Sequence, residues 1–120
     1  MELRRQRHQE YVRSQTLNIW NSLISRLESQ VLFVLTTNEV DSDTFKSLNL
    51  LEEGLDQAHA SLIELLEKDM TKLVFVETQY TIANQVINFI RKRDIKGDIY
   101  KISSFASQLR NTRRHSKVLN

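Results

Sequence analysis

Apolar residues recur at spacings of three and four along the first third of the chain, which is the period of an α-helix. They form one stripe, made of Val12, Thr16, Trp20, Leu23, Leu27, Val31 and Val34. The stripe predicts a first helix over about Glu2–Thr36, roughly 50 Å long. Its first ten residues are nearly all polar, so we expect this end, residues 1–13, to project from the body or to fray.

A break separates this helix from the next apolar stripe. Asn38 can end a helix in the left-handed conformation, and Asp41 is a favoured N-cap residue. A second helix is therefore predicted over about Ser42–Lys68. Gly54 lies inside it and either permits close packing or marks a kink.

No true helix breaker lies between the predicted second helix and the apolar residues that follow it. Asp69 can cap a separate helix over about Met70–Lys92, and we favour this arrangement over one continuous helix from 42 to 92. Gly97 is suited to end the third helix, and Asp98 to cap a fourth that runs to about Asn111.

These elements predict an all-α fold, a bundle of about four helices with a long N-terminal helix and a short C-terminal helix. We expect one helical domain over residues 1–111 and a disordered basic tail over residues 112–120. The apolar spacing is not strict over four heptads, which favours a bundle over a lone long coiled coil.

Two short segments are apolar on every side of the predicted helix axis. They are Val31–Leu35 and Leu73–Val76. The first is also compatible with a β-strand, because it contains β-branched and aromatic residues, but no hairpin partner lies nearby. In the helical interpretation, either the rest of the bundle or a partner protein buries each turn.

The sequence contains no motif for chemistry. Cysteine is absent, and Gly54 and Gly97 are the two glycines, so a phosphate-binding loop and a thiolate metal site are not expected. The histidines, His8, His59 and His115, have no metal-ligand spacing. We therefore expect a protein that is not an enzyme and uses no cofactor, metal ion or small-molecule substrate.

The hydropathy pattern predicts no membrane span. Val31–Leu35 is the longest unbroken apolar run, far short of the ~20 residues that a spanning helix needs. The N-terminal residues have no apolar segment behind them, so no secretory signal is expected. We expect an intracellular protein, cytoplasmic or nuclear.

The net charge of +2 hides a strong segregation. Residues 1–13 carry a charge of +2, residues 14–88 a charge of −7 and residues 89–120 a charge of +7. The basic quarter contains Arg91, Lys92, Arg93, Lys96, Lys101, Arg110, Arg113, Arg114 and Lys117. These side chains either improve solubility and stabilise helix C-termini by their positive charge, or contact an acidic partner.

The pattern as a whole indicates an interaction or scaffold subunit of a larger assembly, which binds protein partners or itself through apolar helix faces. The partner-binding candidates are Tyr11, Trp20, Phe33 and Phe75, although the position of Trp20 on the apolar stripe also suits the core. The alternative function is binding of nucleic acid or an anionic membrane through the basic quarter.

Overall fold

The computed structural model describes residues 2–92, 99–115 and 119 of the chain. The described residues form four helices and contain no strand. They are α1 (Glu2–Thr37), α2 (Ser42–Leu65), α3 (Met70–Arg91) and α4 (Ile99–Arg114). The predicted all-α bundle is therefore confirmed, with a long first helix of 36 residues and a short last helix of 16.

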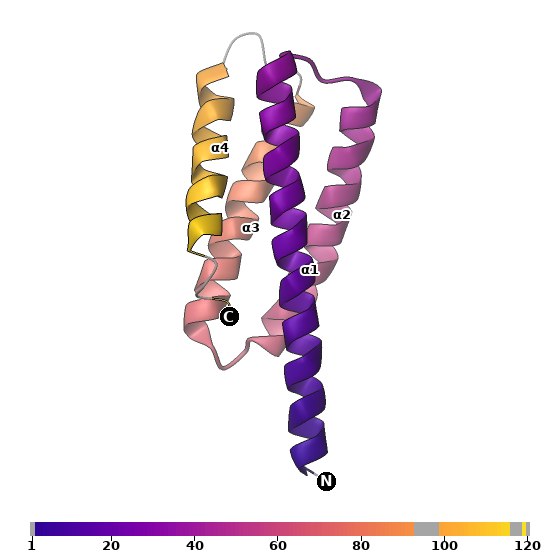
Figure 1. Cartoon of the computed structure of the whole chain (residues 1–120), viewed down its shortest axis with the longest axis vertical. Coiled ribbons are helices and arrows are strands. Elements are labelled where there is room, and N and C mark those ends of the chain that lie inside the picture. Colours follow the sequence, from indigo (N-terminus) through magenta and orange to yellow (C-terminus); the bar gives the residue numbers. More distant parts are fainter. Residues whose placement is uncertain (1, 93–98, 116–118, 120) are drawn as a thin grey trace.

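Each helix runs antiparallel to the one before it (Figure 1). The helices form a ring in which α1 packs between α2 and α4, and α3 packs between the same two on the opposite side. The molecule is 58 Å in its longest dimension because the first turns of α1 extend past the ends of the other helices.

The predicted break between the first two helices is confirmed, both at Asn38, which ends α1, and at Asp41, which begins α2. Asn38 has a φ of 56°, in the left-handed region. The Asp41 carboxylate accepts hydrogen bonds of 2.8 Å from the backbone N–H and the hydroxyl of Thr44, and so caps α2. These bonds lower the pKa of Asp41 below its ordinary value of 3.8. The cap thus stabilises the fold above that pH and is lost on further acidification.

α2 and α3 are separate helices, as predicted, because the Asp69 carboxylate accepts a hydrogen bond from the Lys72 backbone N–H and caps α3. The predicted end of α2 at Lys68 was three residues too late. Leu66 is buried and its backbone N–H donates to the Leu62 carbonyl, which closes α2, and the Asp69 N–H donates in turn to the Leu66 carbonyl.

α4 extends three residues beyond its predicted end at Asn111, so Thr112–Arg114 are helical rather than disordered. The ion pair of Arg113 in this last turn with Glu28 of α1 accounts for the extra length. The predicted helix end at Gly97 and the predicted cap at Asp98 lie outside the described residues, as do 116–118 and 120 of the predicted tail.

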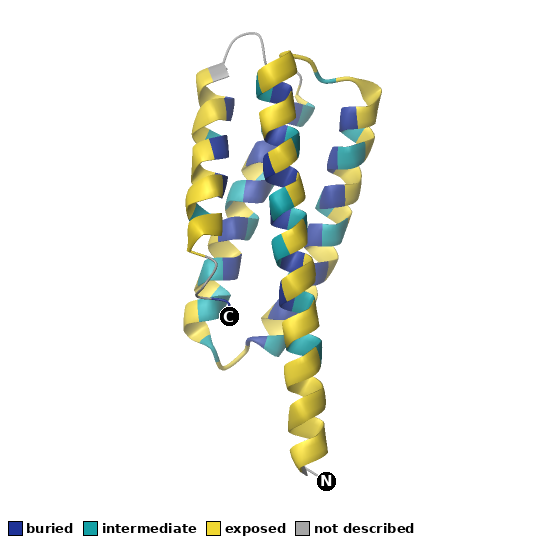
Figure 2. Cartoon of the chain, viewed as in Figure 1, coloured by how far each residue is buried: buried dark blue, intermediate teal, exposed yellow. Residues whose placement is uncertain are grey.

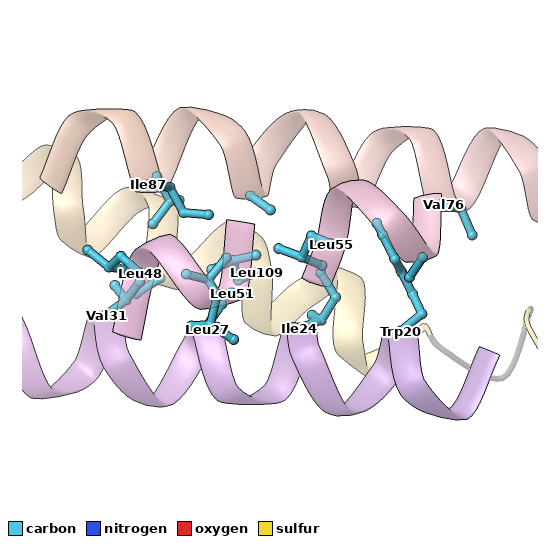
Figure 3. Packing of buried hydrophobic residues seen from close by; sticks show 14 of the residues in the cluster. Trp20, Ile24, Leu27, Val31, Leu48, Leu51, Leu55, Val76, Ile87 and Leu109 are labelled. Atoms are coloured by element: carbon cyan, nitrogen blue, oxygen red, sulfur yellow. The ribbon is translucent and has the colours of Figure 1, made fainter. Parts of the chain in front are cut away.

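The core lies along the axis of the bundle and receives side chains from all four helices (Figure 3). α1 contributes the longest row, made of Leu17, Trp20, Ile24, Leu27, Val31 and Val34. Each of these side chains is at least nine-tenths buried. Burial of one such apolar side chain contributes about 1.5–3 kcal/mol, so this row is the largest single source of stability in α1.

The two all-round apolar turns are helical, but the bundle does not bury them completely. Val31 and Val34 face the core, whereas Leu32 and Phe33 are exposed. In the second turn Val76 is buried, while Val74 is exposed. The bundle therefore buries one side of each turn and leaves the outward side exposed.

Gly54 permits a close approach of α1 and α2. A Cβ atom at this position would lie 3.1 Å from Cδ2 of Leu23, tighter than ordinary van der Waals contact. The close-packing interpretation of this glycine therefore fits the structure, and α2 continues through it as one helix.

We expect Gly54→Leu to lower the free energy of unfolding by about 1–3 kcal/mol, because the new side chain must force α2 away from Leu23. Ala60→Leu is the matched control, since Ala60 is an exposed residue of the same helix. Urea unfolding measures both variants. Equal stability of the two would contradict the close packing at Gly54.

Candidate protein-interaction site

The structure separates the four residues predicted to bind a partner. Tyr11 and Phe33 are on the surface of α1, with 63% and 49% of their areas exposed. Phe75 is half-buried and packs against the core. Trp20 is fully buried at 0%, which removes it from the surface that a partner can reach in this conformation.

A polar contact across the bundle explains the position of Trp20. Its indole Nε1 donates a hydrogen bond of 2.8 Å to Oε1 of Gln79, which is itself buried on α3. A buried indole N–H needs an acceptor, and Gln79 supplies it from the facing helix. The spacing of apolar residues in α1 places Trp20 in the core but carries no information about this distant partner.

The outer face of α1 is formed by Tyr11, Ser14, Asn18, Ser22, Ser29 and Phe33. These residues are spaced by three, four or seven positions, so they lie on one side of the helix, and all are exposed. Ile19 and Leu32 are also exposed and lie at the edges of this face. The outer face of α1 is therefore a long surface of small polar and large apolar side chains.

Charge is nearly absent from this part of the helix. Between Ser14 and Thr37 the sequence contains two charged residues, Arg26 and Glu28. Glu28 is buried, at 5% exposed, so Arg26 is the charged residue that this stretch presents to solvent. An ordinary soluble surface carries roughly 25–35% charged residues, so the outer face of α1 is unusual for a surface in contact with water.

α1 continues beyond the bundle as a charged segment. The residues Leu3–Tyr11, which we call the leader, are all exposed (Figure 2). The leader contains three arginines, Arg4, Arg5 and Arg7, and one acidic residue, Glu10. A helix of this length is marginal in water without packing, and the leader has no buried residue that would stabilise it.

A second, shorter apolar surface lies on α3. A shallow groove there is lined by Met70, Leu73, Val74, Glu77, Thr78, Thr81 and Ile82. The Thr78 and Thr81 hydroxyls donate to backbone carbonyls one turn earlier, which turns these side chains into largely apolar surface. The groove spans 13 residues, or about 20 Å of helix, which is much shorter than the face on α1.

Polar contacts clamp α2 against α3. Nε2 of His59 lies 2.6 Å from Oε1 of Glu77, and the Tyr80 hydroxyl donates a 2.5 Å hydrogen bond to Asp56. The rings of His59 and Tyr80 stack at 3.8 Å. The hydrogen bond to Asp56, and then burial, raise the pKa of Tyr80 above its ordinary value of 10.0. The cluster therefore stabilises the fold below that pH and weakens as the hydroxyl ionises.

Four of the six described members of the basic quarter contact other groups of the same chain. Nε of Arg113 lies 2.6 Å from Glu28, and Nε of Arg110 lies 3.6 Å from the same carboxylate. Arg91 forms an ion pair of 3.0 Å with Glu52, and Lys101 lies over the ring of Phe89.

The other members of the basic quarter divide into two groups. Lys92 and Arg114 are exposed, whereas Arg93, Lys96 and Lys117 lie outside the described residues. The predicted acidic-partner surface is thus reduced by contacts with acidic side chains of α1 and α2. Glu28 was the available signal, because it is the lone acidic residue between Ser14 and Thr37 of the first helix.

Comparison with protein-family models, with curated proteins and with solved structures gave no match to this chain. Within the described residues, no helix combines the length and the apolar character that a membrane span requires.

We expect the double variant Arg110→Ala, Arg113→Ala to lower the free energy of unfolding by about 1–3 kcal/mol, because it leaves the buried Glu28 carboxylate without these partners. Arg114→Ala is the control, since this neighbouring arginine is exposed. Urea unfolding again provides the measurement. If the double variant proves as stable as the control, the ion pairs do not hold α4 against α1.

Proposed function

We propose that this chain is a non-enzymatic interaction subunit of a larger protein assembly, which binds a helix of another protein chain along the outer face of α1. One observation carries the proposal. From Ser14 to Thr37 this helix presents one charged side chain, Arg26, to solvent, while Ile19, Leu32 and Phe33 remain exposed.

The composition of the outer face of α1 resembles an interface more than a free surface. Interface cores are depleted in charged residues and enriched in aromatic ones, and their aromatic residues carry much of the binding energy. Tyr11 and Phe33 supply such aromatic groups near the two ends of the face. The small residues between them, such as Ser22, allow another helix to approach closely.

Length favours α1 over α3 as the principal binding surface. A helix of 36 residues is about 54 Å long, and this length includes the leader, which lies beyond the bundle. The groove on α3 is shorter and contains Glu77, which is already paired with His59. We therefore assign it no primary role.

The alternative function receives less support from the contacts of the described residues. Binding of nucleic acid or an anionic membrane requires cations that are free to face phosphate groups. Arg91, Arg110 and Arg113 instead face carboxylates of the same chain. We therefore propose protein binding rather than phosphate binding.

A photo-reactive phenylalanine analogue in place of Phe33, introduced in the native cell, tests the proposal. We expect a covalent adduct of one defined mass, because a bound helix would cover this half-exposed side chain. The same analogue at Ala60, on the exposed side of α2, is the matched control and should give no defined adduct.

The added substitutions Ile19→Lys and Ser29→Glu should abolish the adduct at position 33 without unfolding the chain, since both residues are exposed. Circular dichroism checks that the fold is retained. Equal labelling at positions 33 and 60, or an adduct that survives both added charges, would rule out the outer face of α1 as the binding surface.

A further inference from the structure

We propose that the bound helix is α1 of a second copy of this chain, antiparallel to the first, with a two-fold axis at Ser22. This inference rests on the proposed function and names its partner. Three features of α1 and of the turn that follows it agree with this register.

The aromatic residues give the first agreement. Tyr11 lies eleven residues before Ser22 and Phe33 lies eleven residues after it. In an antiparallel pair centred on Ser22, Tyr11 of one copy is level with Phe33 of the other, and the same contact recurs at the opposite end by symmetry. Both exposed rings of the outer face of α1 would then be covered.

Charge complementarity gives the second agreement. Arg5 lies seventeen residues before Ser22, and Glu39 lies seventeen residues after it. The turn between α1 and α2 and the first turn of α2 carry three exposed acidic residues, Glu39, Asp41 and Asp43, which we call the acidic corner. In the same register, the basic leader of one copy lies beside the acidic corner of the other.

The leader also provides the space that this arrangement needs. Because its first turns extend past the bundle of its own chain (Figure 1) and its arginines are exposed, the leader can lie beside the end of a second bundle. A second copy docked there would place its acidic corner against Arg4, Arg5 and Arg7 and would stabilise a helix that is marginal alone.

The centre of the face gives the third agreement. Arg26 and Asn18 lie four residues after and four residues before Ser22. The guanidinium of Arg26 in one copy is therefore level with Asn18 of the other, whose side-chain carbonyl can accept its hydrogen bond. Thus the one charged side chain of this stretch would meet a polar partner, and Ser22 at the axis would let the helices approach closely.

The size of the contact is adequate for a dimer. A face about 54 Å long and about 11 Å wide covers on the order of 600 Å² per copy, the lower end of the ~600–1,000 Å² of specific interfaces. A parallel pair would bury the same area but would place the arginines of the two leaders side by side, where like charges repel.

The absence of cysteine from the sequence permits a direct test of the register with single-cysteine variants and a short bismaleimide cross-linker. Ser22→Cys alone should convert most of the chain into covalent dimer. Tyr11→Cys and Phe33→Cys should each remain monomeric alone but form a dimer when mixed. Within a dimer, position 11 of one copy lies about 33 Å from position 11 of the other, and the same holds for position 33. In a mixed dimer, the cysteine at position 11 of one copy lies opposite the cysteine at position 33 of the other, and the second Tyr11–Phe33 contact is unchanged.

Ala60→Cys, on the exposed side of α2, is the control for random collision and should give no dimer. A charge exchange tests the second agreement. Arg5→Glu should reduce cross-linking of Ser22→Cys, and addition of Glu39→Arg to the same chain should restore it.

Efficient cross-linking of Tyr11→Cys or Phe33→Cys alone would overturn the antiparallel register. No dimer from any variant would overturn the second copy as partner. If a photo-adduct then formed at position 33 with a different protein, the proposed function would stand with another partner. If no adduct formed, both the proposed function and the dimer would be rejected.

Discussion

The other three helices all pack on one side of α1, and the burial of that side determines where they lie. The row from Leu17 to Val34 belongs to the core that the four helices share, and two polar contacts hold α3 and α4 on it. Trp20 binds Gln79 of α3, and Glu28 binds the arginines of α4. Because three helices all use the same side of α1, none of them covers its outer face.

This arrangement divides the charges of the chain by role. Several charged residues form contacts between helices, as in the ion pairs of Arg91 on α3 with Glu52 on α2 and of Arg113 on α4 with Glu28 on α1. The outer face of α1 keeps almost no charge, whereas the leader and the acidic corner carry opposite charges at its two ends. A surface with this distribution is complementary to an inverted copy of itself.

Local signals in the sequence predict the helices well, and long-range contacts explain what they miss. Asp41 and Asp69 cap helices because their carboxylates reach N–H groups three residues away, which a short window reveals. The extra turn of α4 depends on Glu28, 85 residues from Arg113, and the burial of Trp20 depends on Gln79, 59 residues away. Neither pair has a spacing that periodicity can detect, so the apolar stripe places Trp20 in the core but does not reveal the polar partner that it meets there.

Multi-angle light scattering of the purified chain, after size exclusion and over a range of concentrations, measures whether the outer face of α1 pairs with itself. We expect a folded species of twice the 14.1 kDa chain mass, which dissociates on dilution into helical monomers. A folded monomer of 14.1 kDa at every concentration would show that the outer face of α1 does not pair with itself and would rule out the antiparallel dimer.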